Sequence, residues 1–161
     1  CYVTPQILER IRRLGVVDSS ATGFMYDLGD GYIANRGQEA MRWMWPHRSL
    51  IDAGMPAPGH SDAMVCQANP FVAMWSMVNR RSDSGGDLDI REAITVDEAL
   101  RAYTILGAWS GREEAIKGSL EVGKLADIAV LDRDPYAIDP MELRDVGVDM
   151  TFVDGRMVHG G

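Results

Sequence analysis

The sequence predicts an α/β protein in which short strands alternate with helices and a small antiparallel sheet follows. Helix signals and short apolar segments alternate through the first two thirds of the chain, a pattern that favours parallel βα units. In the last third, Asp154-Gly155 lies between two alternating segments and predicts a type I′ hairpin. The 161 residues are 46% hydrophobic and 25% charged, as in ordinary soluble globular domains.

Four segments carry helix signals. Thr4-Pro5 and Gly15 bracket a first helix whose apolar spacing predicts one buried stripe. Residues 49–54 resemble the end of a helix that stops at a glycine. Asn69-Pro70 begins a third helix, which places Arg80-Arg81 at the end that favours positive charge. Thr95 and Glu98 form a capping box that opens a fourth helix, through Leu106.

The segments between these helices predict strands and loops. Val16-Val17 and residues 55–58 are short strand candidates, whereas 19–36 contains three glycines and reads as a long loop. Residues 82–92 form an acidic linker. Ile128 to Leu131, 150–153 and 156–159 are the strands expected in the C-terminal sheet, and 140–144 is long enough for a short helix only.

Charge and cysteine content restrict the classes of partner. Sixteen basic against 24 acidic residues give a net charge of −8, which argues against nucleic acid and anionic membranes as partners. No apolar run approaches 18 residues, so no membrane segment is expected. Two cysteines, Cys1 and Cys66, provide no disulfide framework, and the expected location is the cytoplasm. The chain starts at Cys1 in an apolar, strand-like stub, which suggests a piece of a longer polypeptide.

Asp62 is the strongest candidate for a chemical role. It follows Gly59-His60-Ser61, where a short strand opens into a loop, the place at which barrels and open sheets build active sites. A carboxylate there can ligate a divalent metal and accept a proton from water. The alternative is a structural Asp whose side chain caps the next turn.

Other residues carry weaker signals. His60 is a candidate ligand or substrate contact, with a solvated loop histidine as the alternative. Arg48 is a candidate clamp for a substrate carboxylate, although a structural ion pair is the commoner fate of an arginine. The cluster at 41–45 predicts core or subunit contact, with an apolar pocket as the alternative. Gly118 to Lys124 has P-loop spacing, but Leu125 replaces the required hydroxyl residue.

One stretch resembles the amidohydrolase superfamily. Residues 118–131, followed by Asp134-Pro135, resemble the segment in which those enzymes leave their barrel and enter a small β-sandwich. Residues 95–105 resemble the preceding helix, and 152–156 the closing hairpin. Residues 48–54 followed by 59–63 are similar to the branch that includes N-substituted formamide deformylase, with Met64 where that pattern often has proline.

The resemblance implies a fold and an activity. Residues 1–112 would be the last βα units of a (β/α)8 TIM-type barrel, and 113–161 part of the β-sandwich. In the intact enzyme, Asp62 would ligate one of one or two divalent metals, with zinc expected, and act as general acid/base in the hydrolysis of a C–N bond. The substrate would be a small amide, N-acyl or N-formyl compound, and a homo-oligomer is compatible with the fold.

The family's histidine ligands have no match in these 161 residues. The sequence contains no His-x-His, His-Glu-x-x-His or Cys-x-x-Cys pattern. The chain is therefore expected to be inactive alone and to need the remainder of its own polypeptide as a partner. The alternative class is a non-catalytic binding or scaffold protein that retains the fold.

Overall fold

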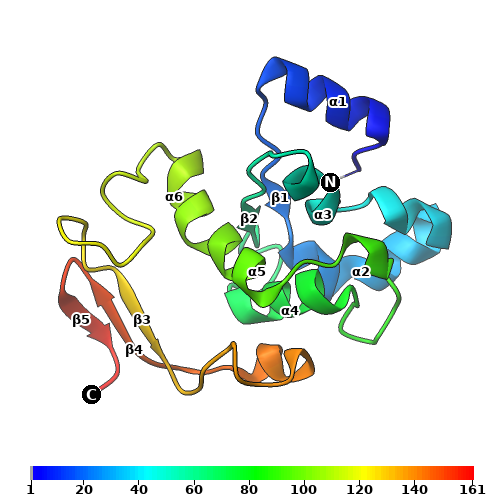
Figure 1. Cartoon of the computed structure of the whole chain (residues 1–161). Helices are drawn as coiled ribbons and strands as arrows, with labels where there is room; N and C mark the ends of the chain where they lie inside the picture. The colour runs from blue at the N-terminus through cyan, green and yellow to red at the C-terminus, as the bar shows by residue number, and fades with distance from the viewer. Residues whose placement is uncertain (1) are drawn as a thin grey trace.

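The computed structural model describes residues 2–161 and contains two small sheets among helices (Figure 1). Strands β1 (Ser20–Ala21) and β2 (Gly59–His60) are parallel, with Ser20 opposite Gly59. The second sheet is antiparallel, in the order β3 (Ile128–Leu131), β4 (Val148–Val153), β5 (Arg156–His159). The α/β class and the C-terminal antiparallel sheet are confirmed.

The N-terminal segment is an extended stub followed by helix α1 (Pro5–Leu14). Tyr2 bridges to Met44, while Cys1 lies outside the described residues. The predicted stop at Gly15 is confirmed, because this residue has the left-handed φ of 64°. The predicted burial of the apolar stripe is wrong. Leu14 is 62% exposed, since no element within residues 2–161 packs over this face of the helix.

Residues 16–36 differ most from the sequence prediction. The strand expected at Val16-Val17 lies instead at β1, where Ser20 and Ala21 are buried against β2. The predicted loop over 19–36 is mostly helix α2 (Gly23–Arg36). Glycine lowers helix propensity, but here close packing needs it, since a Cβ at Gly29 would lie 2.9 Å from the Cβ of Ser82.

The Met and Trp cluster belongs to the hydrophobic core. It runs through the 3-10 helix η1 (Gln38–Trp43) to the start of helix α3 (His47–Asp52). Met41 and Trp45 have no exposed surface, and the Trp45 ring meets Tyr32 edge to face at 5.1 Å. The core alternative is therefore the one that the structure shows for this cluster. The next strand forms at β2, just after the predicted 55–58.

Helix α4 (Pro70–Asn79) crosses the centre of the molecule and is buried along most of its length. Arg80 ends it in a left-handed conformation, with φ of 52°. Arg80 therefore lies at the helix end that favours positive charge, as predicted, but its side chain is only 1% exposed and turns inward. Its guanidinium donates hydrogen bonds to the backbone carbonyls of Met41, Met44, Trp45, Leu88 and Asp89.

The predicted acidic linker is ordered around this arginine. Leu88 in its middle has no exposed surface, and residues 90–92 form the 3-10 helix η2 (Ile90–Glu92). Helix α5 (Val96–Tyr103) then opens with the predicted capping box of Thr95 and Glu98, which is confirmed. The helix expected to run through Leu106 breaks at Thr104, and α6 (Ile105–Ser110) follows.

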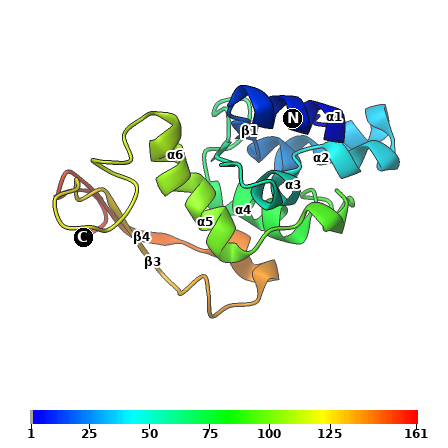
Figure 2. The same cartoon turned by 45° about the horizontal axis from the view of Figure 1, so that its top comes forward.

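The C-terminal sheet is joined to the helices through the 3-10 helix η3 (Pro140–Asp145), which packs on α4 (Figure 2). The indole Nε1 of Trp75 donates to the carbonyl of Met141 at 2.9 Å, and Leu143 is buried in the core. The predicted type I′ hairpin is confirmed by positive φ at both central residues, Asp154 and Gly155. No helix within residues 2–161 has the length and apolarity needed to cross a membrane.

Candidate functional site

The candidate site lies at the edge where the two parallel strands end. Because β1 and β2 run parallel, the residues that follow them, Thr22 and Ser61, emerge on the same side of the sheet. Figure 1 shows α5 beside this strand pair. In α/β folds, ligands bind at the carboxyl ends of parallel strands. This edge of the sheet is therefore where a ligand is expected to bind.

Asp62 lies in the turn immediately after β2. Its backbone is left-handed, with φ of 52°, a conformation that Asp adopts more readily than most residues. Its carbonyl accepts a hydrogen bond from Val65 N at 2.8 Å. The carboxylate is exposed and makes no hydrogen bond to any residue in the described part of the chain. The side-chain cap weighed as the alternative is therefore not formed.

The turn that carries Asp62 is apolar at its tip. Met64 is fully exposed and has a φ of 119°, which is unusual for a residue with a side chain, and Val65 is 61% exposed. The turn closes with Ala63 bridging to Cys66. The neighbourhood of Asp62 thus combines a free carboxylate with exposed apolar side chains.

His60 occupies the last position of β2 and is half-buried. Its backbone carbonyl accepts from Thr22 Oγ1 at 3.4 Å, whereas its ring makes no hydrogen bond to residues 2–161. His60 and Asp62 therefore come from the same strand end, two residues apart. The structure leaves the ring of His60 free for a contact outside the described residues.

Arg48 lies on α3 and is held by two carboxylates. Its Nη1 donates to both oxygens of Glu98 at 2.9 Å, and its Nε donates to Asp52 at 2.8 Å. Burial acts to lower the pKa of Arg48, but these ion pairs outweigh burial and raise it. The contacts favour the structural ion pair over a clamp for substrate, because they join α3 to the start of α5.

Sequence reasoning missed the residues that hold the Asp62 turn against α2. Asp27 accepts hydrogen bonds from Gln67 N at 2.9 Å and from Gln67 Nε2 at 2.8 Å. The neighbouring Cys66 is buried, and burial raises the pKa of its thiol to about 11, so the thiol stays protonated at neutral pH. Only a correct helix prediction for 23–36 could have placed Asp27 here.

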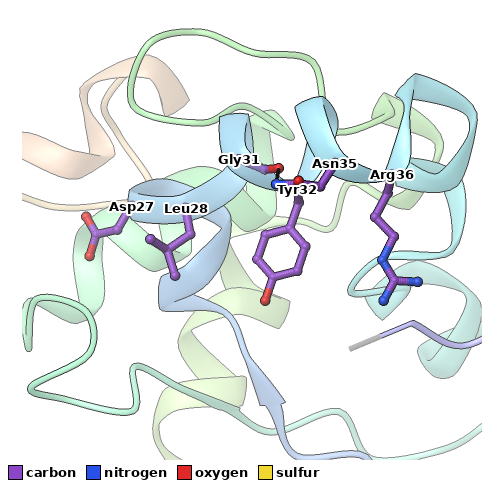
Figure 3. A pocket seen from close by; sticks show the side chains of 6 residues that line it. All are labelled: Asp27, Leu28, Gly31, Tyr32, Asn35 and Arg36. Atoms are coloured by element: carbon purple, nitrogen blue, oxygen red, sulfur yellow. Dashed lines mark hydrogen bonds between the residues drawn. The ribbon is translucent and has the colours of Figure 1, made fainter.

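A pocket of about 300 Å³ opens on the surface of α2 (Figure 3). The side chains of Leu28, Tyr32 and Arg36 extend from the helix in the same direction, and Asp27 lies at one end. Arg36 also stacks over the ring of Tyr2, at 5.6 Å from its centroid. The pocket therefore runs along α2 from Asp27, which binds the Asp62 turn, to Arg36, which contacts the N-terminal stub.

The P-loop-like segment holds its own lysine. Lys124 Nζ donates to Ser119 Oγ at 2.6 Å and to Glu121 at 3.2 Å, and the chain continues toward β3 rather than into a helix. No helix N-terminus is available there to receive a phosphate. The structure agrees with the rejection of a nucleotide site.

A metal centre needs more ligands than the described residues bring together. Nowhere in residues 2–161 do three or more His, Cys, Asp or Glu side chains form a group that could hold a metal ion. An exposed, unpaired carboxylate at a strand end is nevertheless a chemically suitable single ligand for a divalent cation. Asp62 fits a metal site as one contributor to it.

Comparison with known proteins identifies the family. The family model described as "Amidohydrolase family" matches residues 1–159. The chain belongs to the amidohydrolase family. The match covers both sheets and the Asp62 turn, so the resemblance inferred from 118–131 and 48–63 is confirmed at the level of the family.

Individual members of the amidohydrolase family show how much of such a protein this chain represents. It is 38% identical over 149 residues to the N-substituted formamide deformylase of Arthrobacter pascens, matching 91% of this chain and 27% of that protein. It is 28% identical to the putative amidohydrolase YtcJ of Bacillus subtilis, matching 96% of this chain and 30% of that protein.

A solved structure gives a similar share of the longer protein covered by this chain. The crystal structure of an uncharacterized metal-dependent hydrolase from Pyrococcus horikoshii OT3 superposes with a TM-score of 0.74 at 26% identity. The superposition covers 86% of this chain and 29% of that one. The chain thus spans less than a third of the length of these relatives.

Proposed function

We propose that this chain is the C-terminal portion of a hydrolase that cleaves C–N bonds of small amides, N-acyl or N-formyl compounds. The observation that carries the proposal is the free carboxylate of Asp62 at the carboxyl end of β2, inside a family match over residues 1–159. The names of the relatives, a deformylase and a putative amidohydrolase, support the class of bond.

The proposal assigns the chain to two parts of a larger fold. Residues 1–112 contribute the last βα units of a (β/α)8 barrel, and 113–161 contribute strands to a small β-sandwich. The parallel pair β1–β2 supports the first assignment, since two strands of two residues each are too short to form an independent sheet. The antiparallel order of β3, β4 and β5 supports the second.

The site would bind one or two divalent metal ions, with zinc expected, and Asp62 would supply one ligand. When bound, such an ion lowers the pKa of water and polarises a carbonyl group. The remaining ligands would have to come from outside the described residues, because these contain no group of three candidate ligands. For the same reason, the 161-residue chain alone is expected to be inactive.

Asp62 has the chemistry to move the proton that amide hydrolysis requires. Its exposed carboxylate accepts no hydrogen bond from the described residues, so its lone pairs are free for an attacking water molecule. It would accept the proton of that water and then return it to the nitrogen of the leaving amine. The oxygen of the water first adds to the carbonyl carbon, and the bond between that carbon and nitrogen then breaks as nitrogen receives the proton from Asp62 and leaves as the amine.

His60 and the apolar turn would contact the substrate. The ring of His60 forms no hydrogen bond within residues 2–161, and His60 lies two residues before Asp62 at the same strand end, which suits a polar contact to the amide. Met64 and Val65 present apolar surface beside Asp62 and suit an apolar substituent. The Arg48 clamp is the weakest of the sequence predictions, because Glu98 and Asp52 already bind this guanidinium.

The test is hydrolysis of a panel of N-acyl and N-formyl amines by the full-length protein, with metal analysis of the same preparation. Asp62→Asn should lower kcat by at least about 10²-fold, because general acid/base catalysis contributes about 10²–10⁴-fold. Asp149→Asn is the matched control, since Asp149 is also exposed but lies on β4 in the other sheet. Undiminished hydrolysis by Asp62→Asn would remove this residue from the mechanism.

The same preparation tests the non-catalytic alternative. A full-length protein that holds no stoichiometric metal and hydrolyses no member of the panel would support a binding or scaffold role. Stoichiometric metal with measurable hydrolysis would support the enzyme.

A further inference from the structure

A buried hydroxyl pair connects helix α5 to the strand end that carries Asp62. Tyr103, the last residue of α5, and Thr22, the residue after β1, have their hydroxyl oxygens 2.7 Å apart. Thr22 Oγ1 also lies 3.4 Å from the carbonyl oxygen of His60. Thr22 has no exposed surface, so water does not replace either partner.

The direction of these hydrogen bonds follows from the number of protons. A carbonyl oxygen only accepts, so in the 3.4 Å contact the single proton of Thr22 points to His60, and the phenol of Tyr103 is then the donor in the 2.7 Å bond; by distance alone, either hydroxyl can donate in that bond. Burial raises the pKa of Tyr103 to about 12, and the phenol therefore keeps its proton at neutral pH. The two bonds form one directed path from α5 to the backbone of β2.

Two glycines show how closely the neighbouring elements hold residues 59–62. A Cβ on Gly59 would lie 2.8 Å from Thr22 Oγ1 and 3.0 Å from the ring of Tyr103. A Cβ on Gly23 would lie 3.0 Å from the Cα of Ser61. Distances this short leave no room for a side chain at either glycine, so the backbone of the strand end packs directly against Thr22, Tyr103 and α2. The glycine at the start of Gly59-His60-Ser61-Asp62 is therefore explained by the close approach of Tyr103.

The position of the Asp62 carboxylate depends on this backbone. The carboxylate forms no hydrogen bond with other side chains of residues 2–161, and only the Asp62 carbonyl is fixed, by Val65 N at 2.8 Å. A carboxylate without partners of its own takes its position from the strand end that carries it. Catalytic groups must be held to within about 0.5 Å for full activity.

We propose that Tyr103 is a positioning residue for the candidate site and acts through the hydroxyl of Thr22 to fix the strand end that carries Asp62. The role assigned to Asp62 rests on the proposed function, whereas the restraint on residues 59–62 rests on the contacts alone. Neither Tyr103 nor Thr22 needs to touch substrate. Removing either hydroxyl should loosen the strand end while the hydrophobic packing of the Tyr103 ring against Gly59 remains.

The experiment compares variants of the full-length protein. Tyr103→Phe and Thr22→Val each remove one hydroxyl, and Thr22→Ser retains it. Tyr136→Phe is the matched control, since its phenol donates to Asp97 at 3.1 Å on the exposed surface, 62% of Tyr136 being accessible. All variants are assayed well below their melting temperatures for kcat, KM, zinc affinity and hydrogen–deuterium exchange of the peptide spanning 59–67.

We expect Tyr103→Phe and Thr22→Val to lower kcat or zinc affinity by about 10–100-fold, the usual cost of losing an outer partner of a metal ligand. KM should change by less than about 3-fold, because no contact to substrate is lost. The double variant should lose no more kcat or zinc affinity than the more impaired single variant, because both substitutions interrupt the same hydrogen-bonded path. Exchange in 59–67 should accelerate in both single variants, and Thr22→Ser and Tyr136→Phe should resemble the unsubstituted protein.

Unchanged exchange in 59–67 for both single variants would overturn the proposal, even if Asp62→Asn is inactive. Effects on kcat that multiply in the double variant would also overturn it, since they would show two independent contributions. If exchange accelerates but Asp62→Asn retains full activity, the restraint stands and the catalytic assignment of Asp62 fails. The two hypotheses are therefore separable in one set of proteins.

Discussion

Arg80 offers the sharpest test of how the core is held together. Arg80 is only 1% exposed, and its guanidinium donates hydrogen bonds to five backbone carbonyls. Within residues 2–161, no carboxylate is among its hydrogen-bond partners. Burial lowers the pKa of Arg80 to about 9, which still leaves it charged at neutral pH. Arg80→Met keeps an unbranched stem of similar shape and removes every side-chain donor. The carbonyls of Met41, Trp45 and Asp89 keep a backbone N–H donor, whereas those of Met44 and Leu88 lose the donor that the described residues give them.

The expected cost follows from the number of carbonyls left behind. Three of the five keep a backbone N–H donor, so two stay unpaired, the carbonyls of Met44 and Leu88, and each costs about 2 kcal/mol. The free energy of unfolding should therefore fall by about 4 kcal/mol, a large part of the 5–15 kcal/mol typical of a native protein. With a urea slope of about 3 kcal/mol per M, the unfolding midpoint should fall by about 1.3 M.

The assay is pulse proteolysis of the full-length protein across a urea series. Arg81→Met is the matched control, since Arg81 is the exposed neighbour and donates only to the Gly85 carbonyl, at 3.2 Å. Its midpoint should change by less than about 0.2 M, in line with surface substitutions. If Arg80→Met and Arg81→Met shift the midpoint equally, the carbonyls around Arg80 do not need its guanidinium, and the reasoning is refuted.

Four further substitutions and one dye-binding measurement test other parts of the structure. Burial lowers the pKa of His47 to about 4 in the folded protein, whereas the pKa in the unfolded chain is about 6.5, so the unfolded chain binds the proton first as the pH falls. The free energy of unfolding should therefore fall by on the order of 3 kcal/mol between pH 6.5 and pH 4. His47→Phe should abolish this pH dependence in melting curves recorded across the same range. Thr95→Ala should cost about 1 kcal/mol through loss of the capping box, measured as a lower melting temperature. Gly31→Ala should stabilise α2 by up to about 1 kcal/mol because its Cβ meets open space, whereas Gly29→Ala should destabilise it; equal effects in thermal melts would contradict the packing explanation. The 161-residue chain alone should bind an apolar dye and self-associate through the exposed stripe of α1, and a monodisperse chain that melts cooperatively without binding dye would count against this.

Local rules predicted the elements whose signals are local. The capping box at Thr95, the left-handed Gly15 and the Asp154-Gly155 hairpin depend on a few neighbouring residues, and the structure confirms each of them. The position of Asp62 after a short strand was also predictable, because the Gly-His-Ser-Asp motif marks where the strand opens. The family followed from residues 118–131 together with 48–54 and 59–63.

The errors arose where distant contacts override local preference. Helix α2 contains glycines that argue against a helix, yet Gly29 is required by Ser82, more than 50 residues away. Arg80 ends its helix as expected, but its side chain turns toward carbonyls supplied by η1, which no local pattern predicts. Tyr103 could not be linked to the site for the same reason, since its partner Thr22 lies 81 positions earlier.

This separation in sequence also bears on the order in which the site can form during folding. The hydroxyl bond between Thr22 and Tyr103 closes a segment of about 80 residues, and contacts of such long range form late, because the entropy of loop closure must be offset first. Until α5 packs against β2, residues 59–62 lack the hydrogen bonds that fix their backbone in the folded protein. On the proposed function, the carboxylate of Asp62 would reach its final position only at the end of folding.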